Sequence, residues 1–329
     1  MERHTLDYYI PEKALSCQCL YIHLGSLEGD VDYSGRTHLL EHLLVAFDKR
    51  RTEEERRRYI IQAKTTFDYM CFTVYYNHYM VSDAEVHDIL FSIRSARSIQ
   101  SRMFEECKED VIQEIRKFRS NREKIFVNIG NPMYVERLPV GRIEDVSAMT
   151  LPIIQKFVQE QYRKAEAELV HITVGRLYYQ LKESRNMIAY KVDSQRVLNM
   201  IFYEIVFFNF IIGMGLSLAE FHMTIMSGRL FVMIVDSYAV DVEEKLKDVK
   251  IFKTGLREVR KRYANANEFN LEQQIQIAGE CLCGHERILR LKNVRYMLKI
   301  QSWHRLYNEY KRYLKNMTIL SVDRKEMPE

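Results

Sequence analysis

The stretch Gly35–His42 reads GRTHLLEH and holds two histidines four positions apart, with a glutamate directly before the second. In a helix, residues four apart lie about 40° apart around the axis, so the side chains of His38 and His42 can converge on one ion. Neutral imidazole is a good zinc ligand, and a carboxylate at Glu41 could take a proton from water beside that ion. The stretch therefore predicts a helix that carries two metal ligands and a base.

A third protein ligand is needed, because two imidazoles alone hold zinc weakly. A helix predicted over residues 101–118 offers several carboxylates, and the residue pattern by itself leaves the choice among them open. A bare His-x-x-Glu-His pattern also arises by chance, in which case the two histidines are a structural pair. The candidate third ligands are Glu105, Glu106, Glu109, Asp110 and Glu114.

Alternating and helical patterns on both sides of this motif predict a mixed α/β lobe. The period-two segment Cys17–Leu24 predicts a strand, and the turn-rich residues 25–30 predict a loop. Apolar residues at helical spacing follow from Gly35 onward. Further along the chain we expect an aromatic strand over 67–80, helices near 86–93, 101–118 and 153–162, and a buried strand over 167–175.

The second half of the chain begins with a long apolar segment, residues 197–218, which is long enough to cross a bilayer. It contains Asn199, Glu204 and Asn209, and a lone carboxylate at mid-bilayer costs about 2.5 kcal/mol or more. We therefore expect a helix buried on all sides inside a second lobe and no membrane span. A strand pair over 221–238, a helix over 242–257 and further charged helices should follow.

Composition places the chain among ordinary globular proteins and excludes little else. Its 49 basic and 45 acidic residues leave a net charge of +4, too balanced to indicate a nucleic-acid or anionic-membrane partner. The six cysteines lie in a chain of 329 residues that does not need disulfides, so we interpret them as reduced thiols. The N-terminal residues lack the apolar core of a secretory signal. Together these features predict a cytoplasmic protein.

The motif and its surroundings resemble the inverted-zincin metallopeptidases of the pitrilysin, insulysin and mitochondrial processing peptidase family, which carry zinc in the order His-x-x-Glu-His. The resemblance extends over most of the first lobe, from a Gly-Ser loop before the motif to the closing strand. The matching segments are Leu24–Glu28, Gly35, Gln62–Asp68, Val111–Ile115, Asn131–Gly141 and Met149–Gly175.

This resemblance implies a role for each matching residue. His38, His42 and Glu114 would be the zinc ligands, Glu41 the general base, and Gln62, Ala63 and Thr65 part of an edge strand that holds the substrate backbone. The 72-position interval from His42 to Glu114 is slightly short for the family, which leaves Glu109 and Glu106 as possible substitutes. Cys107 stands where the family has a second acid, so Glu106 or Asp110 could orient a ligand instead.

The resemblance also implies an α+β fold of two α/β lobes, each a mostly antiparallel sheet covered by helices, with the second lobe shortened. We place these lobes at residues 1–180 and 186–329. The Arg/Tyr segment with which the family grips its substrate is not visible after Leu218. A second subunit of similar fold would then supply it, in a heterodimer or a homodimer.

The predicted activity is a zinc-dependent metalloendopeptidase that acts on short unfolded peptides or peptide precursors. The alternative is a peptide-binding or scaffold subunit of such a heterodimer without catalysis. Nucleic-acid binding is the least favoured class, because acids are interleaved with basic stretches such as Arg257–Arg262.

Overall fold

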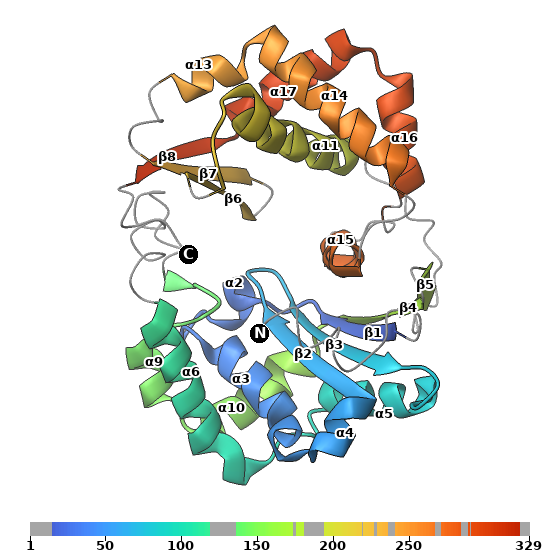
Figure 1. Cartoon of the computed structure of the whole chain (residues 1–329). Coiled ribbons are helices and arrows are strands. Elements are labelled where there is room, and N and C mark those ends of the chain that lie inside the picture. Colours follow the sequence, from blue (N-terminus) through green and yellow to red (C-terminus); the bar gives the residue numbers. More distant parts are fainter. Residues whose placement is uncertain are drawn as a thin grey trace. The chain divides into compact units, whose positions relative to one another are not determined.

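The computed structural model describes residues 15–118, 136–173, 176–180, 194–218, 220–226, 229–235, 241–266, 271–283, 289 and 291–322 (Figure 1). The chain divides into two compact units. Unit 1 takes Met1–Phe118, Met133–Ala189 and Asn270–His285, and unit 2 takes Arg119–Pro132, Tyr190–Phe269 and Glu286–Glu329. The lobe boundary expected between residues 180 and 186 lies outside the described residues. Unit 1 also includes a late segment, Asn270–His285, that the expected division assigned to the second lobe.

Unit 1 is built on a five-stranded sheet with the order β2-β3-β1-β4-β5, in which all neighbouring strands are antiparallel. The single aromatic strand expected over 67–80 is wrong in its bounds. Its first residues form a turn, where the Thr66 amide donates to the Tyr69 carbonyl at 2.8 Å. The strands are β1 (Leu15–Ile22), β2 (Tyr59–Thr65), β3 (Met70–Asn77), β4 (Ala167–Thr173) and β5 (Arg176–Gln180).

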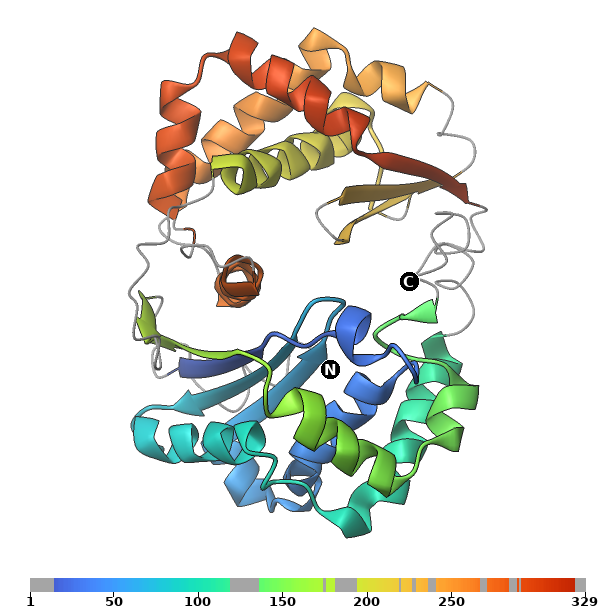
Figure 2. The same ribbon diagram turned by 180° about the vertical axis from the view of Figure 1, so that it is seen from behind.

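Most helices of unit 1 cover one face of this sheet, as Figure 2 shows from behind. Because side chains alternate along a strand, Leu20 and Ile22 of β1 point to this face and join a continuous apolar core. The core takes Leu39, Leu40, Leu43 and Leu44 from the motif helix α3. The helices are α2 (Ser26–Gly29), α3 (Arg36–Val45), α4 (Glu53–Arg58), α5 (Asp83–Arg94), α6 (Phe104–Phe118), α9 (Ile143–Ala148) and α10 (Leu151–Phe157).

The opposite face of the sheet is covered by α15 (Leu271–Cys283), which comes from the last quarter of the chain (Figure 1). The hydroxyl of Tyr21 on β1 donates to the Ile275 carbonyl of α15 at 2.6 Å. A Cβ on Gly279 would lie 2.7 Å from the Tyr21 ring and 2.9 Å from that of Tyr69. The absent side chain at Gly279 thus lets α15 approach the aromatic face closely, and the helix buries a surface that would otherwise be exposed.

Unit 2 combines a three-stranded sheet with five described helices. Strands β6 and β7 are antiparallel, and β8 is parallel to β7. Both the strand pair and the charged helices were predicted, whereas β8 was not. The elements are β6 (Phe221–Met226), β7 (Arg229–Val235), β8 (Thr318–Val322), α11 (Ser194–Phe208), α13 (Val242–Leu246), α14 (Val249–Asn265), α16 (Leu291–Ile300) and α17 (Trp303–Lys315). The α+β class with a smaller second sheet is therefore confirmed.

Helix α11 and the turn after it, together Gln195–Gly213, form the one described helix long and apolar enough to cross a membrane. Half of its apolar window is buried inside unit 2, so the expected burial on all sides is met on one side only. The buried side carries Glu204, whose carboxylate accepts a hydrogen bond from the Tyr263 hydroxyl of α14 at 2.7 Å. Such a polar contact within the unit suits a core helix better than a membrane span.

Candidate metal centre and active site

The motif helix α3 begins at a turn that Asp30 holds together. One carboxylate oxygen of Asp30 accepts from the Gly35 amide at 2.7 Å, and the other accepts from the Thr37 amide at 2.8 Å and the Thr37 hydroxyl at 2.9 Å. The first turn of a helix has amides without partners inside the helix, so this side chain caps α3 from outside. Sequence reasoning missed Asp30; the signal was an acid in a turn six residues before the first residue of the helix.

Asp30 is almost fully buried, and burial raises its pKa to about 6, although the Thr37 and Gly35 hydrogen bonds and nearby Arg36 act in the opposite direction. Arg36 is itself buried and donates from Nε to the Gly29 carbonyl at 2.9 Å. Its guanidinium lies 4.3 Å from the centre of the Phe157 ring. Both charged groups fix the start of α3 before any metal is bound.

Within α3, His38 and His42 turn their rings toward the same point, as their spacing predicted. Their Nε2 atoms lie 3.2 Å apart. Glu114 of α6 reaches both: its Oε2 is 3.3 Å from His38 Nε2, and its Oε1 is 3.5 Å from His42 Nε2. The structure thus selects Glu114 from the acids of α6 and brings it to the histidine pair from a different helix.

Electrostatics around this triangle favour a charged carboxylate. Hydrogen bonds from His38 and then His42 lower the pKa of Glu114 far below its usual range. For His38, burial lowers the pKa, but the Glu114 hydrogen bond and the Glu41 charge outweigh it and the net shift is upward. His38 Nδ1 lies 3.2 Å from the Val140 carbonyl oxygen. A proton on Nδ1 that is donated to Val140 leaves Nε2 free to bind a metal.

The donor atoms fit zinc. Atoms bound at about 2.0–2.1 Å to one tetrahedral ion lie roughly 3.4 Å from each other. The two Nε2 atoms are 3.2 Å apart, and each faces a different oxygen of Glu114, Oε2 at 3.3 Å from His38 and Oε1 at 3.5 Å from His42. The donor set of two imidazoles and one carboxylate leaves a fourth position for water, as in catalytic zinc sites. Among the described residues, His38, Glu41 and His42 also form a group that could hold a metal, since their ligand atoms lie within 4.8 Å of one another. This group has Glu41 in place of Glu114, so both carboxylates lie close to the histidine pair.

Glu41 lies beside the triangle and is buried, with 7% of its surface exposed. Its Oε2 accepts a hydrogen bond of 2.5 Å from the hydroxyl of Thr65, the last residue of β2. The family resemblance assigns Thr65 only to the substrate-binding strand. The contact with Glu41 gives it a second role, which is to hold the candidate base in place.

Two other predicted positions lie on the free edge of the sheet. Gln62 and Ala63 belong to β2, where they pair with Thr73 and Phe72 of β3 on one side only. Because β2 is an edge strand among the described strands, its outer edge offers backbone groups that no described strand pairs. The described contacts join neither Gln62 nor Ala63 to the metal triangle, so their assignment to substrate binding stays a prediction.

The remaining acids of α6 point elsewhere. Glu106 accepts from the Lys49 ammonium at 3.3 Å, and Asp110 contacts the same ammonium. Glu109 accepts from Gln113 at 2.5 Å and lies 3.5 Å from Arg116. The structure therefore does not place Glu106 or Asp110 beside a metal ligand as we expected, because Lys49, which sequence spacing did not connect with α6, competes for them.

A glycine pair joins α3 to the loop that carries Val140. Gly35 and Gly141 have φ angles of +88° and +87°, and a Cβ on Gly141 would lie 2.4 Å from the Gly35 Cα. We expect Gly141→Ala to lower the free energy of unfolding by about 2–4 kcal/mol, through left-handed strain and overpacking. It should also reduce zinc retention, since Val140 would move from His38. Urea unfolding and metal analysis measure the two effects.

Gly215 provides the matched control for this change. Its φ is +72°, but no atom lies within 4 Å of the Cβ it would gain. Gly215→Ala should cost only the strain, about 1–2 kcal/mol, and leave zinc binding unchanged. Equal effects of the two substitutions would contradict the contact that we assign to Gly141.

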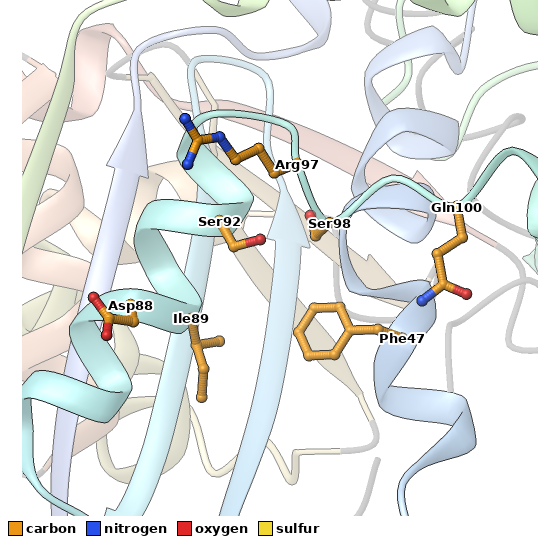
Figure 3. A pocket seen from close by; sticks show the side chains of 7 residues that line it. All are labelled: Phe47, Asp88, Ile89, Ser92, Arg97, Ser98 and Gln100. Carbon is orange, nitrogen blue, oxygen red and sulfur yellow. The ribbon is translucent and has the colours of Figure 1, made fainter.

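A pocket of about 390 Å³ opens elsewhere in unit 1, between α5 and the segment after α3 (Figure 3). Phe47 projects from that segment toward Ile89 of α5, and the polar side chains of Ser92 and Gln100 lie around them. None of the metal-triangle residues lines this pocket. The candidate metal site, beside Thr65 at the end of β2, is therefore separate from this cavity.

Comparison with known proteins agrees with this geometry. Residues 8–138 match the model of the insulinase family, peptidase family M16. Over these residues the chain is similar to the insulinase family. The matched range contains His38, Glu41, His42 and Glu114. No curated protein sequence matches the chain.

Solved structures extend the likeness of fold beyond the insulinase lobe. A protease from Helicobacter pylori shares 14% identity at a TM-score of 0.62, over 95% of each chain. The first half of the periplasmic protease PqqL from Escherichia coli shares 11% identity at a TM-score of 0.59, over 96% of this chain and 89% of that one. This chain spans 45% of full PqqL. A chain of Complex III2 from Candida albicans shares 9% identity at a TM-score of 0.62, over 92% and 88%.

Proposed function

We propose that this chain is the metal-bearing subunit of a zinc metalloendopeptidase that hydrolyses short unfolded peptides or peptide precursors. The observation that carries the proposal is the convergence of His38, His42 and Glu114, in which the two Nε2 atoms lie 3.2 Å apart and each lies 3.3 or 3.5 Å from one oxygen of the Glu114 carboxylate. The similarity of residues 8–138 to a peptidase family supports the same chemistry. Zinc, once bound, would polarise the scissile carbonyl and lower the pKa of water at the site.

In the proposed reaction, the chain's own residues position the substrate and move the proton. An extended peptide adds to the free edge of β2, where main-chain hydrogen bonds hold it with little demand on its side chains. Glu41 takes a proton from the attacking water and passes it to the leaving amine. Since Oε2 of Glu41 accepts from Thr65, we assign the proton to Oε1.

Thr65→Val tests the contact with Glu41. A hydrogen bond to a charged group is worth about 1.5–3 kcal/mol, so we expect kcat to fall at least about tenfold with zinc content unchanged. Thr65→Ser keeps the hydroxyl and should restore most of the rate. If the valine variant turned over peptide at the parent rate, Thr65 would have no part in placing the base.

We also propose a partner subunit of similar fold, as a heterodimer or a homodimer, that supplies the substrate-gripping Arg and Tyr. The absence of that segment after Leu218 motivates this proposal. Digestion of a peptide library with and without the product of a neighbouring gene, combined with size-exclusion chromatography, tests it. Zinc-loaded protein that binds peptides but never cleaves them, even with the partner, would instead support the binding-subunit alternative.

The proposed compartment is the cytoplasm. Cys17, Cys19, Cys71 and Cys107 are free, buried thiols, and a reducing compartment keeps thiols in this state. Fractionation of the native host with an antibody to the chain tests this placement.

A further inference from the structure

Three helices of unit 2 carry a concentration of positive charge that the net charge of the chain hides. Helices α14, α16 and α17 hold 13 basic and only 2 acidic residues. The rest of the chain, with 36 of the 49 basic and 43 of the 45 acidic residues, is net negative. All 13 basic side chains are exposed. The acid-bearing helix between them in sequence, α15, packs in unit 1 instead.

On α14, helical spacing gathers these charges on one side. Lys250, Lys253, Arg257 and Lys261 recur at intervals of three and four residues and are exposed. Phe252, Leu256, Val259 and Tyr263 occupy the buried side of the same helix. The cations therefore form a continuous stripe along the solvent side of α14.

Contacts between the helices join this stripe to α16 and α17. The Lys253 ammonium lies 3.7 Å from the centre of the Trp303 ring, at the first residue of α17. Arg260 donates to the Leu298 carbonyl of α16 at 3.3 Å. Arg295 of α16 donates in turn to the Tyr263 carbonyl at 2.8 Å. We call the exposed Lys and Arg side chains of α14, α16 and α17 the basic face.

Few carboxylates neutralise the basic face. Among the described residues, its ion pairs join Arg257 to Glu258, Arg312 to Glu309 and Arg262 to Glu204. The acids of neighbouring α13 pair with Lys247, outside the three helices. The lysines form no ion pair with a described carboxylate, so the face is free to attract an anionic partner. These lysines are Lys250, Lys253, Lys261, Lys292, Lys299, Lys311 and Lys315.

Apolar side chains protrude from the same face. Tyr296 is 64% exposed and Ile300 is 52% exposed, and they lie one helical turn apart on α16 with Lys299 between them in sequence. Two exposed apolar side chains among lysines match the layers of a lipid surface, where charged headgroups lie above apolar acyl chains. Tyr and Trp side chains are enriched at the headgroup level.

Nucleic acid fits the face less well. Proteins that bind single strands leave aromatic rings open for bases to stack on. Here the Lys253 ammonium lies over the Trp303 ring, which is also stacked on the His304 ring with 3.5 Å between the ring centres. The Lys311 ammonium lies 4.9 Å from the centre of the Tyr307 ring. An exposed aliphatic side chain such as that of Ile300 also makes no favourable contact with a phosphate backbone.

We propose that the basic face of α14, α16 and α17 binds an anionic lipid surface, with phosphate-bearing headgroups against its lysines and with Tyr296 and Ile300 in the headgroup layer. This is peripheral binding and needs no spanning helix. It is independent of the proposed peptidase activity and holds with or without zinc.

Sedimentation of the purified full-length chain with lipid vesicles tests the proposal at 0.15 M salt, where weak surface attraction is screened over about 8 Å. We expect binding to vesicles of phosphatidylcholine with 30% phosphatidylserine and none to phosphatidylcholine alone. Binding should weaken steeply as salt is raised. No binding to the anionic vesicles would overturn the proposal.

Matched triple variants locate the contact. Lys261→Gln, Lys292→Gln and Lys299→Gln together should weaken vesicle binding about 100-fold, since each cation near an anionic leaflet contributes roughly a fivefold factor. Arg57→Gln, Lys156→Gln and Lys164→Gln remove three exposed cations from unit 1 and should leave binding unchanged. Equal losses in the two triples would show non-specific attraction and refute the assigned face.

Two further measurements separate lipid from other anions. The pair Tyr296→Ser and Ile300→Ser should weaken vesicle binding at least about fivefold and leave its salt dependence unchanged, because it removes apolar contact and no charge. A fluorescent oligonucleotide serves as the competing polyanion. If the chain bound the oligonucleotide more tightly than the anionic vesicles, and the Lys261, Lys292 and Lys299 triple variant lost this binding, nucleic acid would replace lipid as the occupant of the basic face.

Discussion

Glu41→Gln should keep zinc in the site and reduce peptide hydrolysis by at least about 100-fold, since general acid–base catalysis contributes about 10²–10⁴-fold to a rate. The amide has the size of the carboxylate, and its oxygen can still accept from the Thr65 hydroxyl, which now donates over 2.5 Å. It cannot take a proton from water. Metal analysis and peptide digestion of the same sample, with the partner subunit present, measure both properties.

The control for this substitution is Glu160→Gln, which removes one negative charge from an exposed position in unit 1. It should leave cleavage at the parent rate. Full activity of the Glu41 variant would remove Glu41 from the mechanism. Loss of zinc in that variant would show instead that Glu41 supports the metal site.

His42→Ala should remove the metal itself. The Nε2 of His42 lies 3.2 Å from Nε2 of His38 and 3.5 Å from Oε1 of Glu114. Without it two donors remain, and we expect zinc affinity to fall by more than the 10–100-fold that loss of an outer hydrogen-bond partner causes. Dialysis against a zinc buffer followed by metal analysis should find well under one zinc per chain, and peptide cleavage should be lost with it.

His87→Ala is the matched control, because it removes an imidazole from α5 that lies against Asp88 and outside the metal cluster. Zinc content should stay at one per chain. If His42→Ala retained zinc as well, the donor triangle would be a structural histidine pair with a carboxylate, and the peptidase proposal would fall with it.

The candidate site was largely predictable because its first part is local. Five consecutive residues of one helix set His38, Glu41 and His42 in order, and helical geometry alone brings the two imidazoles together. Glu114 was one of several acids in α6, and sequence spacing could not decide among them. The choice depends on how α6 packs against α3, which leaves Glu114 at the histidines and turns Glu106 and Asp110 to Lys49.

The supporting residues were hidden for the same reason. Asp30 caps α3 and Val140 accepts from His38, yet neither carries a motif of its own. A backbone carbonyl such as that of Val140 has no residue-type signature. Thr65 was noticed for its strand, whereas its bond to Glu41 follows from where β2 ends beside α3.

By itself the sequence determined several helices and strands of unit 1, the α+β class and the metal-binding residue types, because helix and strand periods and the His-x-x-Glu-His spacing act over a few neighbouring residues. Only the tertiary structure decided which acid joins the histidines, that α15 covers the sheet of unit 1, and that basic residues from three helices share one face. Those outcomes depend on packing between segments far apart in the chain. Residue spacing does not specify which buried faces pack together, so these long-range contacts are decided only when the core forms.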